Sequence, residues 1–88
     1  MIYSIAYEIR NIERTSRFVR RINEFGDNIQ YLSNSFFLQS DNTITQLYND
    51  FRSITDAEDR ILIIQVKNKN ALMGWLNSTV VNWIKEHN

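Results

Sequence analysis

The chain has 88 residues, contains no cysteine and no proline, and balances ten basic residues with ten acidic ones. Its length fits one domain with a small hydrophobic core, so we expect a single domain over residues 1–88. The lack of cysteine excludes disulfides and thiolate metal sites, and the zero net charge excludes an overall field that would attract nucleic acid.

The first residues show no basic region and no small-residue cleavage site, so they do not resemble a signal peptide. The longest apolar run, residues 61–64, is far too short to span a bilayer. We therefore expect a cytoplasmic protein without a membrane partner. Glycine occurs only at positions 26 and 74, which argues against linkers and a second domain.

Residues 1–10 predict a central β-strand, because they are rich in β-branched and aromatic residues. Alternation along a strand gives it two faces. The larger side chains, expected to face helices, are Tyr3, Ile5, Tyr7 and Ile9. The smaller set, which ends in a carboxylate, is Ile2, Ser4, Ala6 and Glu8.

A first helix is predicted from an N-cap at Asn11 to about Phe25. Its apolar positions recur at helical spacing and are Phe18, Val19, Ile22 and Phe25. Gly26 then suits the left-handed position that ends many helices. The opposite side carries a row of arginines spaced four, three and four residues apart, namely Arg10, Arg14, Arg17 and Arg21.

Two short strands, residues 28–32 and 35–39, are predicted next, with Ser33-Asn34 as the turn between them. One bent strand is the alternative interpretation. A second helix begins at the capping box Thr43 to Gln46. Its apolar stripe is Ile44, Leu47, Tyr48, Phe51 and Ile54.

Residues 61–66 form a predicted strand that is apolar on both faces, and a short helix follows from about Ser78. The resulting order predicts an α+β, ferredoxin-like βαββαβ fold: a four-stranded antiparallel sheet plus a short C-terminal helix. Right-handed crossovers place both long helices on one face. The other face is expected to carry Ile2, Ala6, Ile61 and Ile63. Either the C-terminal segment or a second subunit is expected to cover it, and a two-fold homodimer, with help from the C-terminal segment, is favoured.

Several short motifs resemble those of the SinR-like small proteins, which are similar to the small CRISPR-associated endoribonuclease and adaptation subunit and, more distantly, to the VapD toxins. The motifs are M-I-Y to Y-E-I at 1–9, Y-L-S-N-S-F at 31–36, E-D-R at 58–60, G-W-L at 74–76 and W-I at 83–84. The resemblance implies a ferredoxin-like subunit that dimerises through its sheets.

The resemblance also implies a site. In the CRISPR-associated family an aspartate ends the first strand, and one from each subunit holds a divalent metal, Mg²⁺ or Mn²⁺, for phosphodiester hydrolysis. The matching residue is Glu8, which is one methylene longer. Other members of that family act as DNA scaffolds, so the resemblance is compatible with a metal-dependent endonuclease acting on RNA or DNA and with a binding protein that does not cleave.

Each candidate residue also has a structural interpretation. Glu8 can be a catalytic metal ligand or a strand-end acid paired with Arg10. The arginine row can bind nucleic-acid phosphates or form a solvated helix face. Trp75 and Trp83 are expected to be core or interface anchors rather than platforms for bases, and His87 is expected to lie in a fraying terminus without a catalytic role.

These observations lead to one expected function with two alternatives. We expect a homodimeric, nucleic-acid-associated protein that contacts DNA or RNA through the arginine row, with Glu8 as the centre of any metal-dependent phosphodiesterase activity at the dimer axis. The alternatives are a non-catalytic protein-interaction or scaffold module and an endoribonuclease toxin similar to VapD.

Overall fold

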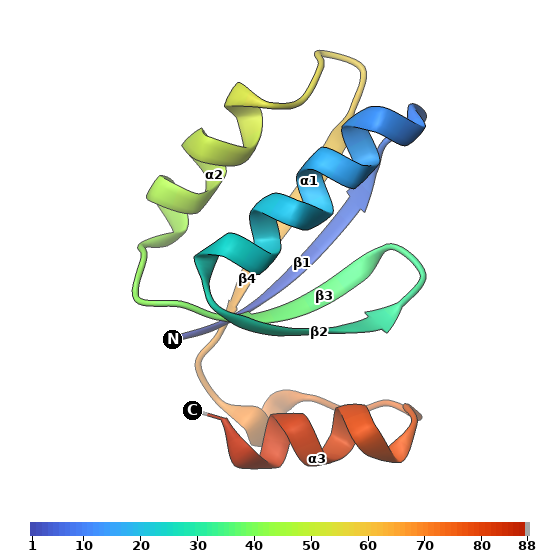
Figure 1. Ribbon diagram of the computed structural model, residues 1–88. Helices are drawn as coiled ribbons and strands as arrows, with labels where there is room; N and C mark the ends of the chain where they lie inside the picture. The colour runs from blue at the N-terminus through green and yellow to red at the C-terminus, as the bar shows by residue number, and fades with distance from the viewer. Residues whose placement is uncertain (88) are drawn as a thin grey trace.

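The computed structural model describes residues 1–87. The elements in chain order are β1 (Ile2–Glu8), α1 (Ile12–Phe25), β2 (Asp27–Leu32), β3 (Ser35–Gln39), α2 (Ile44–Ser53), β4 (Arg60–Val66), a short 3₁₀ helix (Lys69–Ala71) and α3 (Ser78–Glu86). The strands pair antiparallel in the order β2-β3-β1-β4, with α1 and α2 on one face and α3 against the other (Figure 1). The expected ferredoxin-like fold with a C-terminal helix is confirmed.

Local signals in the sequence account for most element boundaries. The Asn11 side chain accepts a hydrogen bond from the backbone N–H of Arg14, which caps α1. Thr43 and Gln46 form both hydrogen bonds of the capping box at the start of α2. β2 and β3 are separate strands, so the bent-strand alternative is wrong, and the bulge near Tyr31 adjusts their register beside the Ser33-Asn34 turn.

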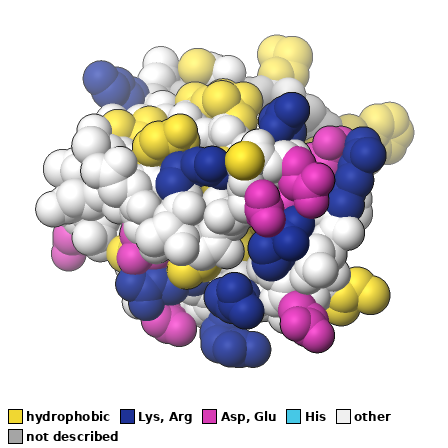
Figure 2. Space-filling view, turned by 90° about the horizontal axis from the view of Figure 1, so that it is seen from above, with side chains coloured by type: hydrophobic (Ala, Val, Ile, Leu, Met, Phe, Trp, Pro, Cys, Tyr) yellow, Lys and Arg dark blue, Asp and Glu magenta, His cyan; other side chains and the backbone are white. Residues whose placement is uncertain are grey.

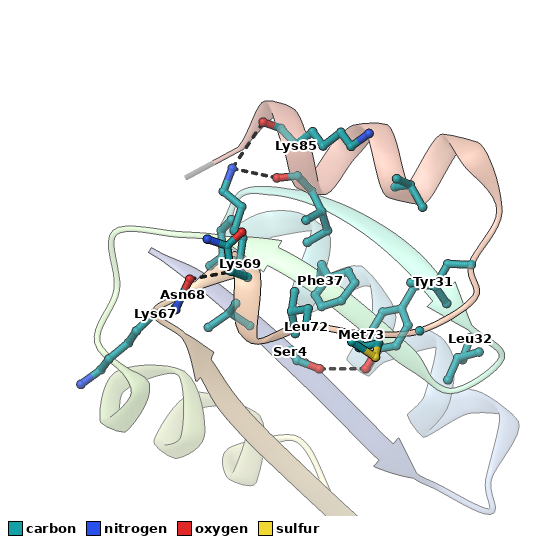
Figure 3. Close-up of a pocket in the computed structure, with 17 residues that line it drawn as sticks. Ser4, Tyr31, Leu32, Phe37, Lys67, Asn68, Lys69, Leu72, Met73 and Lys85 are labelled. Carbon is teal, nitrogen blue, oxygen red and sulfur yellow. Dashed lines mark hydrogen bonds between the residues drawn. The ribbon is translucent and has the colours of Figure 1, made fainter.

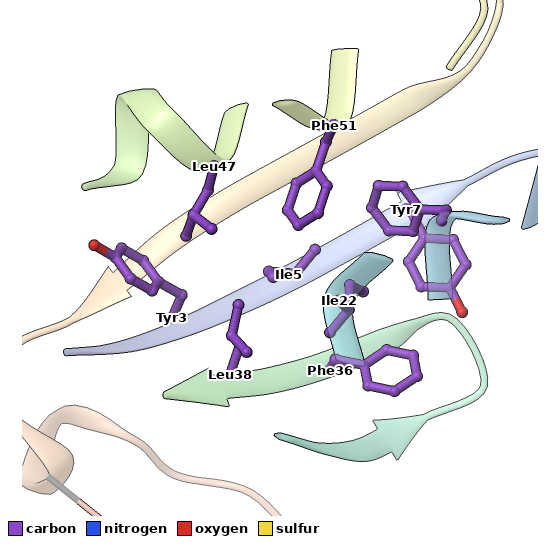
Figure 4. Packing of buried hydrophobic residues seen from close by; sticks show 9 residues of the cluster. Tyr3, Ile5, Tyr7, Ile22, Phe36, Leu38, Leu47 and Phe51 are labelled. Carbon is purple, nitrogen blue, oxygen red and sulfur yellow. The ribbon is translucent and has the colours of Figure 1, made fainter. Parts of the chain in front are cut away.

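The main core lies between the sheet and the two long helices (Figure 4). Aromatic rings from three elements contact one another there: the Phe18 ring centroid lies 4.9 Å from that of Tyr7 and 4.8 Å from that of Phe51. The buried members are Tyr3, Ile5, Tyr7, Phe18, Ile22, Phe36, Leu38, Leu47 and Phe51. The larger side chains of β1 therefore face the helices as predicted.

A second, smaller core lies under α3 on the opposite face of the sheet. Phe37 of β3 stacks on Tyr31 of β2 with ring centroids 4.1 Å apart, and Val80 and Trp83 of α3 pack onto them. His87 stacks on Trp83, and its Nε2 atom lies 2.6 Å from the Asp27 carboxylate. The C-terminal segment thus covers β2, β3 and the beginning of β1, and His87 is held in place rather than frayed.

On the face of the sheet away from α1 and α2, the part formed by β1 and β4 carries other side chains than those predicted. Register pairs Ile63 with Ile5 and Ile61 with Tyr7, so these two isoleucines face the helices and pack against the main core. The predicted placement of Ile61 and Ile63 on the uncovered face is therefore wrong. The side chains that lie there are Ser4, Ala6, Leu62 and Ile64, and we call this surface the open half-face.

Gly26 joins α1 to β2 in a backbone conformation with φ 156° and ψ −170°. This is an extended region open essentially to glycine alone, and it is not the left-handed helix end that the sequence predicts. A Cβ atom at this position would overlap the backbone carbonyl oxygen of Gln39. Glycine is needed here because it can adopt this φ angle and because it leaves room for the carbonyl oxygen of Gln39.

None of the helices within residues 1–87 combines the length and the apolar character that a bilayer crossing needs.

Candidate nucleic-acid interface

Glu8 and Arg10 lie at the carboxyl end of β1, on the edge of the open half-face. Their side chains are 62% and 86% exposed, and the closest approach of carboxylate and guanidinium is 3.6 Å. Register places Glu8 opposite Arg60, and together they border a shallow pocket of about 250 Å³ next to Leu62. The predicted pairing of Glu8 with Arg10 is present as a solvated ion pair.

Glu8 alone does not fit a metal site within one subunit. Residues 1–87 contain no group of three or more His, Cys, Asp or Glu side chains arranged to hold a metal ion. Mg²⁺ prefers octahedral coordination by oxygen, keeps several waters, and is usually bound by one or two carboxylates together with substrate phosphates. Glu8 would provide one carboxylate within a subunit, and a second copy of the chain would provide another.

Arg14 lies in the arginine row but contacts protein carboxylates. Its Nε and Nη2 atoms donate to the two oxygens of Asp59 at 3.0 and 3.1 Å, a bidentate pair. Glu58 lies 3.4 Å from the same guanidinium. The Asp59 side chain is 1% exposed, whereas that of Arg14 is 20% exposed. Arg14 thus fastens α1 to the loop between α2 and β4.

The charges of this pair stabilise each other's ionised form. The hydrogen bond from Arg14 holds the pKa of the Asp59 carboxyl below its usual value, and the backbone N–H of Asp56 acts in the same direction. The pKa of Arg14 is correspondingly raised by its hydrogen bond to Asp59. Arg14 therefore has a structural partner, and the prediction that it contacts phosphate is not favoured by its surroundings.

Arg21 has a similar role further along α1. Its Nε and Nη2 atoms donate to the Asp50 carboxylate of α2 at 2.7 and 2.6 Å, and Nη1 donates to Glu24 at 2.7 Å. The hydrogen bonds to Asp50 and then Glu24 raise the pKa of Arg21. The guanidinium also lies over the Phe25 ring, 5.1 Å from its centroid. Arg21 joins α1 to α2 and has little capacity left for a ligand.

The remaining arginines of α1 point to solvent. Arg17 and Arg20 are exposed, and within residues 1–87 neither has a carboxylate within 4.0 Å. They lie on the outer side of α1, and we call these two residues the outer arginine stripe. Arg10, which precedes the helix, is not part of it, because its guanidinium lies 3.6 Å from the Glu8 carboxylate. Arg20 was not among the predicted contact residues, although its spacing of three residues from Arg17 places it on the same side of the helix.

Acidic side chains interrupt the basic surface around the stripe. Figure 2, which views the molecule from above, shows basic and acidic groups interspersed on that face instead of a continuous basic field. This agrees with the zero net charge. Any contact with a polyanion would therefore depend on a few positioned guanidinium groups.

The two tryptophans have different surroundings. Trp83 is 8% exposed and anchors α3, which confirms the predicted packing role. Trp75 is 100% exposed, so its predicted packing does not occur within the subunit.

No protein-family model matches the chain, and no curated protein matches it. Among solved structures, the chain is similar to the crystal structure of a hypothetical protein, TT1823, from Thermus thermophilus. The TM-score is 0.66 with 18% sequence identity, and the match covers 86% of this chain and 93% of the other. At this level of identity the likeness extends to the fold alone.

Proposed function

We propose that this chain is a homodimeric protein that binds the phosphate backbone of nucleic acid through the outer arginine stripe. The observation that carries the proposal is the pair Arg17 and Arg20, which are exposed and lack a carboxylate partner within residues 1–87. By contrast, Arg14 and Arg21 are engaged by Asp59 and Asp50. A cation that is not already neutralised is what a phosphate oxygen requires.

The spacing of these arginines suits an extended anion. Arg17 and Arg20 are separated by about 4.5 Å along the axis of α1, given a rise of 1.5 Å per residue. Arg10 precedes the helix and is paired with Glu8, so it is not counted in the stripe. Guanidinium groups bind phosphate oxygens with paired donors, and these contacts carry no base preference. The proposal therefore applies to the backbone of RNA or DNA, without sequence specificity.

The proposal includes a homodimer for two reasons. A dimer would carry two outer arginine stripes, and it would cover apolar surface that is exposed in one subunit. Leu62 and Ile64 are 59% and 53% exposed on the open half-face. Covering a large aliphatic side chain contributes about 1.5–3 kcal/mol relative to leaving it in water. A symmetric pair is the commonest way in which a small protein covers such a face.

The test compares two pairs of charge deletions. Arg17→Ala with Arg20→Ala is expected to weaken binding of labelled single-stranded RNA and duplex DNA by about 10- to 100-fold at low salt, because two phosphate contacts are lost. Fluorescence anisotropy measures this affinity.

The matched control is Lys67→Ala with Lys85→Ala, which removes the same charge from exposed residues near α3. The control is expected to bind within about threefold of the wild type. Equal losses in both variants would mean that net charge, rather than the stripe, determines binding. No loss in the arginine variant would contradict the proposal.

A second candidate function, metal-dependent phosphodiester hydrolysis, is favoured by the position of Glu8. This exposed carboxylate lies at the edge of the open half-face, so a second copy packed there would bring its own Glu8 to the same region. Two carboxylates would provide the oxygen ligands that Mg²⁺ or Mn²⁺ takes.

This candidate predicts cleavage of labelled RNA or DNA that requires Mg²⁺ or Mn²⁺ and stops with chelator. Glu8→Gln is expected to lower the cleavage rate by at least the roughly 10- to 100-fold that loss of a residue supporting a metal ligand costs, because Glu8 would bind the metal directly. The control is Glu13→Gln, an exposed acid at the start of α1. Cleavage that persists in Glu8→Gln, or a complete lack of cleavage by the wild type, would reject the candidate and leave a binding protein or scaffold.

A further inference from the structure

The connector of residues 72–77, between the 3₁₀ helix and α3, carries the most exposed apolar side chains of the described chain. Met73 is 101% exposed and Trp75 is 100% exposed. No atom lies within 4 Å of where a Cβ of Gly74 would stand. Monomeric proteins rarely leave large apolar side chains clustered in water without a binding role. Within residues 1–87, Trp75 thus has no acceptor in its own subunit, whereas Met73 borders the groove between the connector and the sheet.

The connector is held at both ends, which keeps Trp75 away from its own sheet. The N–H of Leu72 bonds to the carbonyl of Lys69, and Leu76 packs into the core under α3. Successive side chains of an extended segment point in opposite directions. Because Leu76 points inward, Trp75 points outward. Trp83 and the contact between His87 and Asp27 hold α3 in place behind it.

An acceptor of matching chemistry lies on the same molecule. The open half-face (Ser4, Ala6, Leu62 and Ile64) contains no charged side chain. At Ser4 it continues into a groove of about 1050 Å³ between the sheet, the connector and α3. The groove has an apolar floor, and its lining also includes Lys67, Lys69 and Lys85. Figure 3 shows the groove, with Ser4 and Tyr31 joined by a 2.8 Å hydrogen bond between their hydroxyl groups. A buried indole N–H usually finds an acceptor, and these hydroxyl oxygens supply one.

We propose that two copies exchange their connectors, so that Met73 and Trp75 of each copy pack on the open half-face of the other. This inference rests on the homodimer of the proposed function and identifies what forms it. A two-fold interface is self-complementary, and each chain supplies one donor segment and one acceptor surface.

The area available supports a stable pair. A tryptophan buries about 150–250 Å², and it does so twice in a symmetric dimer. Met73, Leu62 and Ile64 add to this on each side. A standard specific interface buries about 1,600 Å² in total. The tryptophans alone would supply roughly a fifth to a third of that area, and they would lie near its centre, where interface tryptophans contribute most.

The first test removes the donor side chains. Met73→Ser with Trp75→Ser is expected to convert a dimer into a monomer in light scattering, because a buried interface tryptophan is commonly worth about 30-fold in affinity and occurs twice, so the dissociation constant rises about 1,000-fold. The control is Ile12→Ser, which removes an 85% exposed side chain on the other layer of the molecule and is expected to leave a dimer.

The second test is complementation between two defective chains. A chain with Leu62→Glu and Ile64→Glu keeps its connector but loses its acceptor, and the Met73→Ser, Trp75→Ser chain keeps only its acceptor. Each is expected to be monomeric alone, and an equimolar mixture is expected to form a heterodimer with one intact contact. Because both sets of positions are exposed in the subunit, thermal unfolding followed by circular dichroism should show that both variants remain folded.

The outcomes separate the inference from the proposed function. The connector exchange is overturned if the variant without Met73 and Trp75 is still a dimer, or if the mixture of the two variants stays monomeric. The homodimer itself is tested separately by the mass of the wild type in solution. A wild type that is monomeric at all concentrations overturns both the exchange and the homodimer. Binding of nucleic acid is measured separately by anisotropy, so its failure would affect the proposed function without affecting the exchange.

Discussion

Gly26→Ala is expected to destabilise the folded protein by about 2–6 kcal/mol, which is a large part of the stability of a small domain. The methyl group would force the residue out of its extended φ 156° conformation, at about 1–3 kcal/mol. It would also overlap the carbonyl oxygen of Gln39 on β3, and such overpacking costs another 1–3 kcal/mol or so. Urea unfolding followed by circular dichroism measures the change.

Gly74→Ala provides the control, because a Cβ at this position meets no atom within 4 Å. We expect stability equal to the wild type or higher by about 0.4–1 kcal/mol, since alanine reduces the freedom of the unfolded chain. If Gly26→Ala and Gly74→Ala have the same stability, the close approach of β3 to the end of α1 is incorrect.

Glutamate substitutions on the two sides of β4 are expected to have opposite consequences. Ile63→Glu places a carboxylate at a partly buried position against the main core and should unfold the protein or destabilise it by several kcal/mol, because the charge has no partner there and loses part of its hydration. Leu62→Glu with Ile64→Glu places two charges on the open half-face, where both positions are more than half exposed. The double variant should remain folded but become monomeric.

Light scattering and circular dichroism on the same samples distinguish these results. A folded monomer from Leu62→Glu with Ile64→Glu supports dimerisation through the open half-face. A folded dimer from that variant would contradict it. An Ile63→Glu protein as stable as the wild type would contradict the register between β1 and β4 that turns Ile63 toward the helices.

Most elements and their order are predictable from the sequence because local signals specify them. The caps at Asn11 and Thr43 set the starts of both long helices, and alternation identified which side of β1 faces them. Alternation could not orient β4, because residues 61–64 are apolar without interruption. Only pairing with β1 decides which isoleucines are buried.

The candidate site was less predictable, because the state of each arginine depends on partners that are distant in sequence. Arg14 pairs with Asp59 and Arg21 with Asp50, separated by 45 and 29 residues. Spacing along α1 identifies the row but not the carboxylates that approach it after folding. The exposure of Trp75 could not be predicted from the sequence either, since it follows from the inward packing of Leu76 and α3.

The measurement that tests the central claim most directly is the salt dependence of nucleic-acid affinity. Anisotropy titrations of wild type and of the Arg17→Ala, Arg20→Ala variant with duplex DNA and single-stranded RNA would be run over a range of salt concentrations. We expect the logarithm of the wild-type binding constant to fall linearly with the logarithm of salt, and we expect the variant to have a slope shallower by about 1.4–1.8 for two lost contacts. No binding at low salt, or equal slopes for the two proteins, would contradict phosphate recognition by the outer arginine stripe.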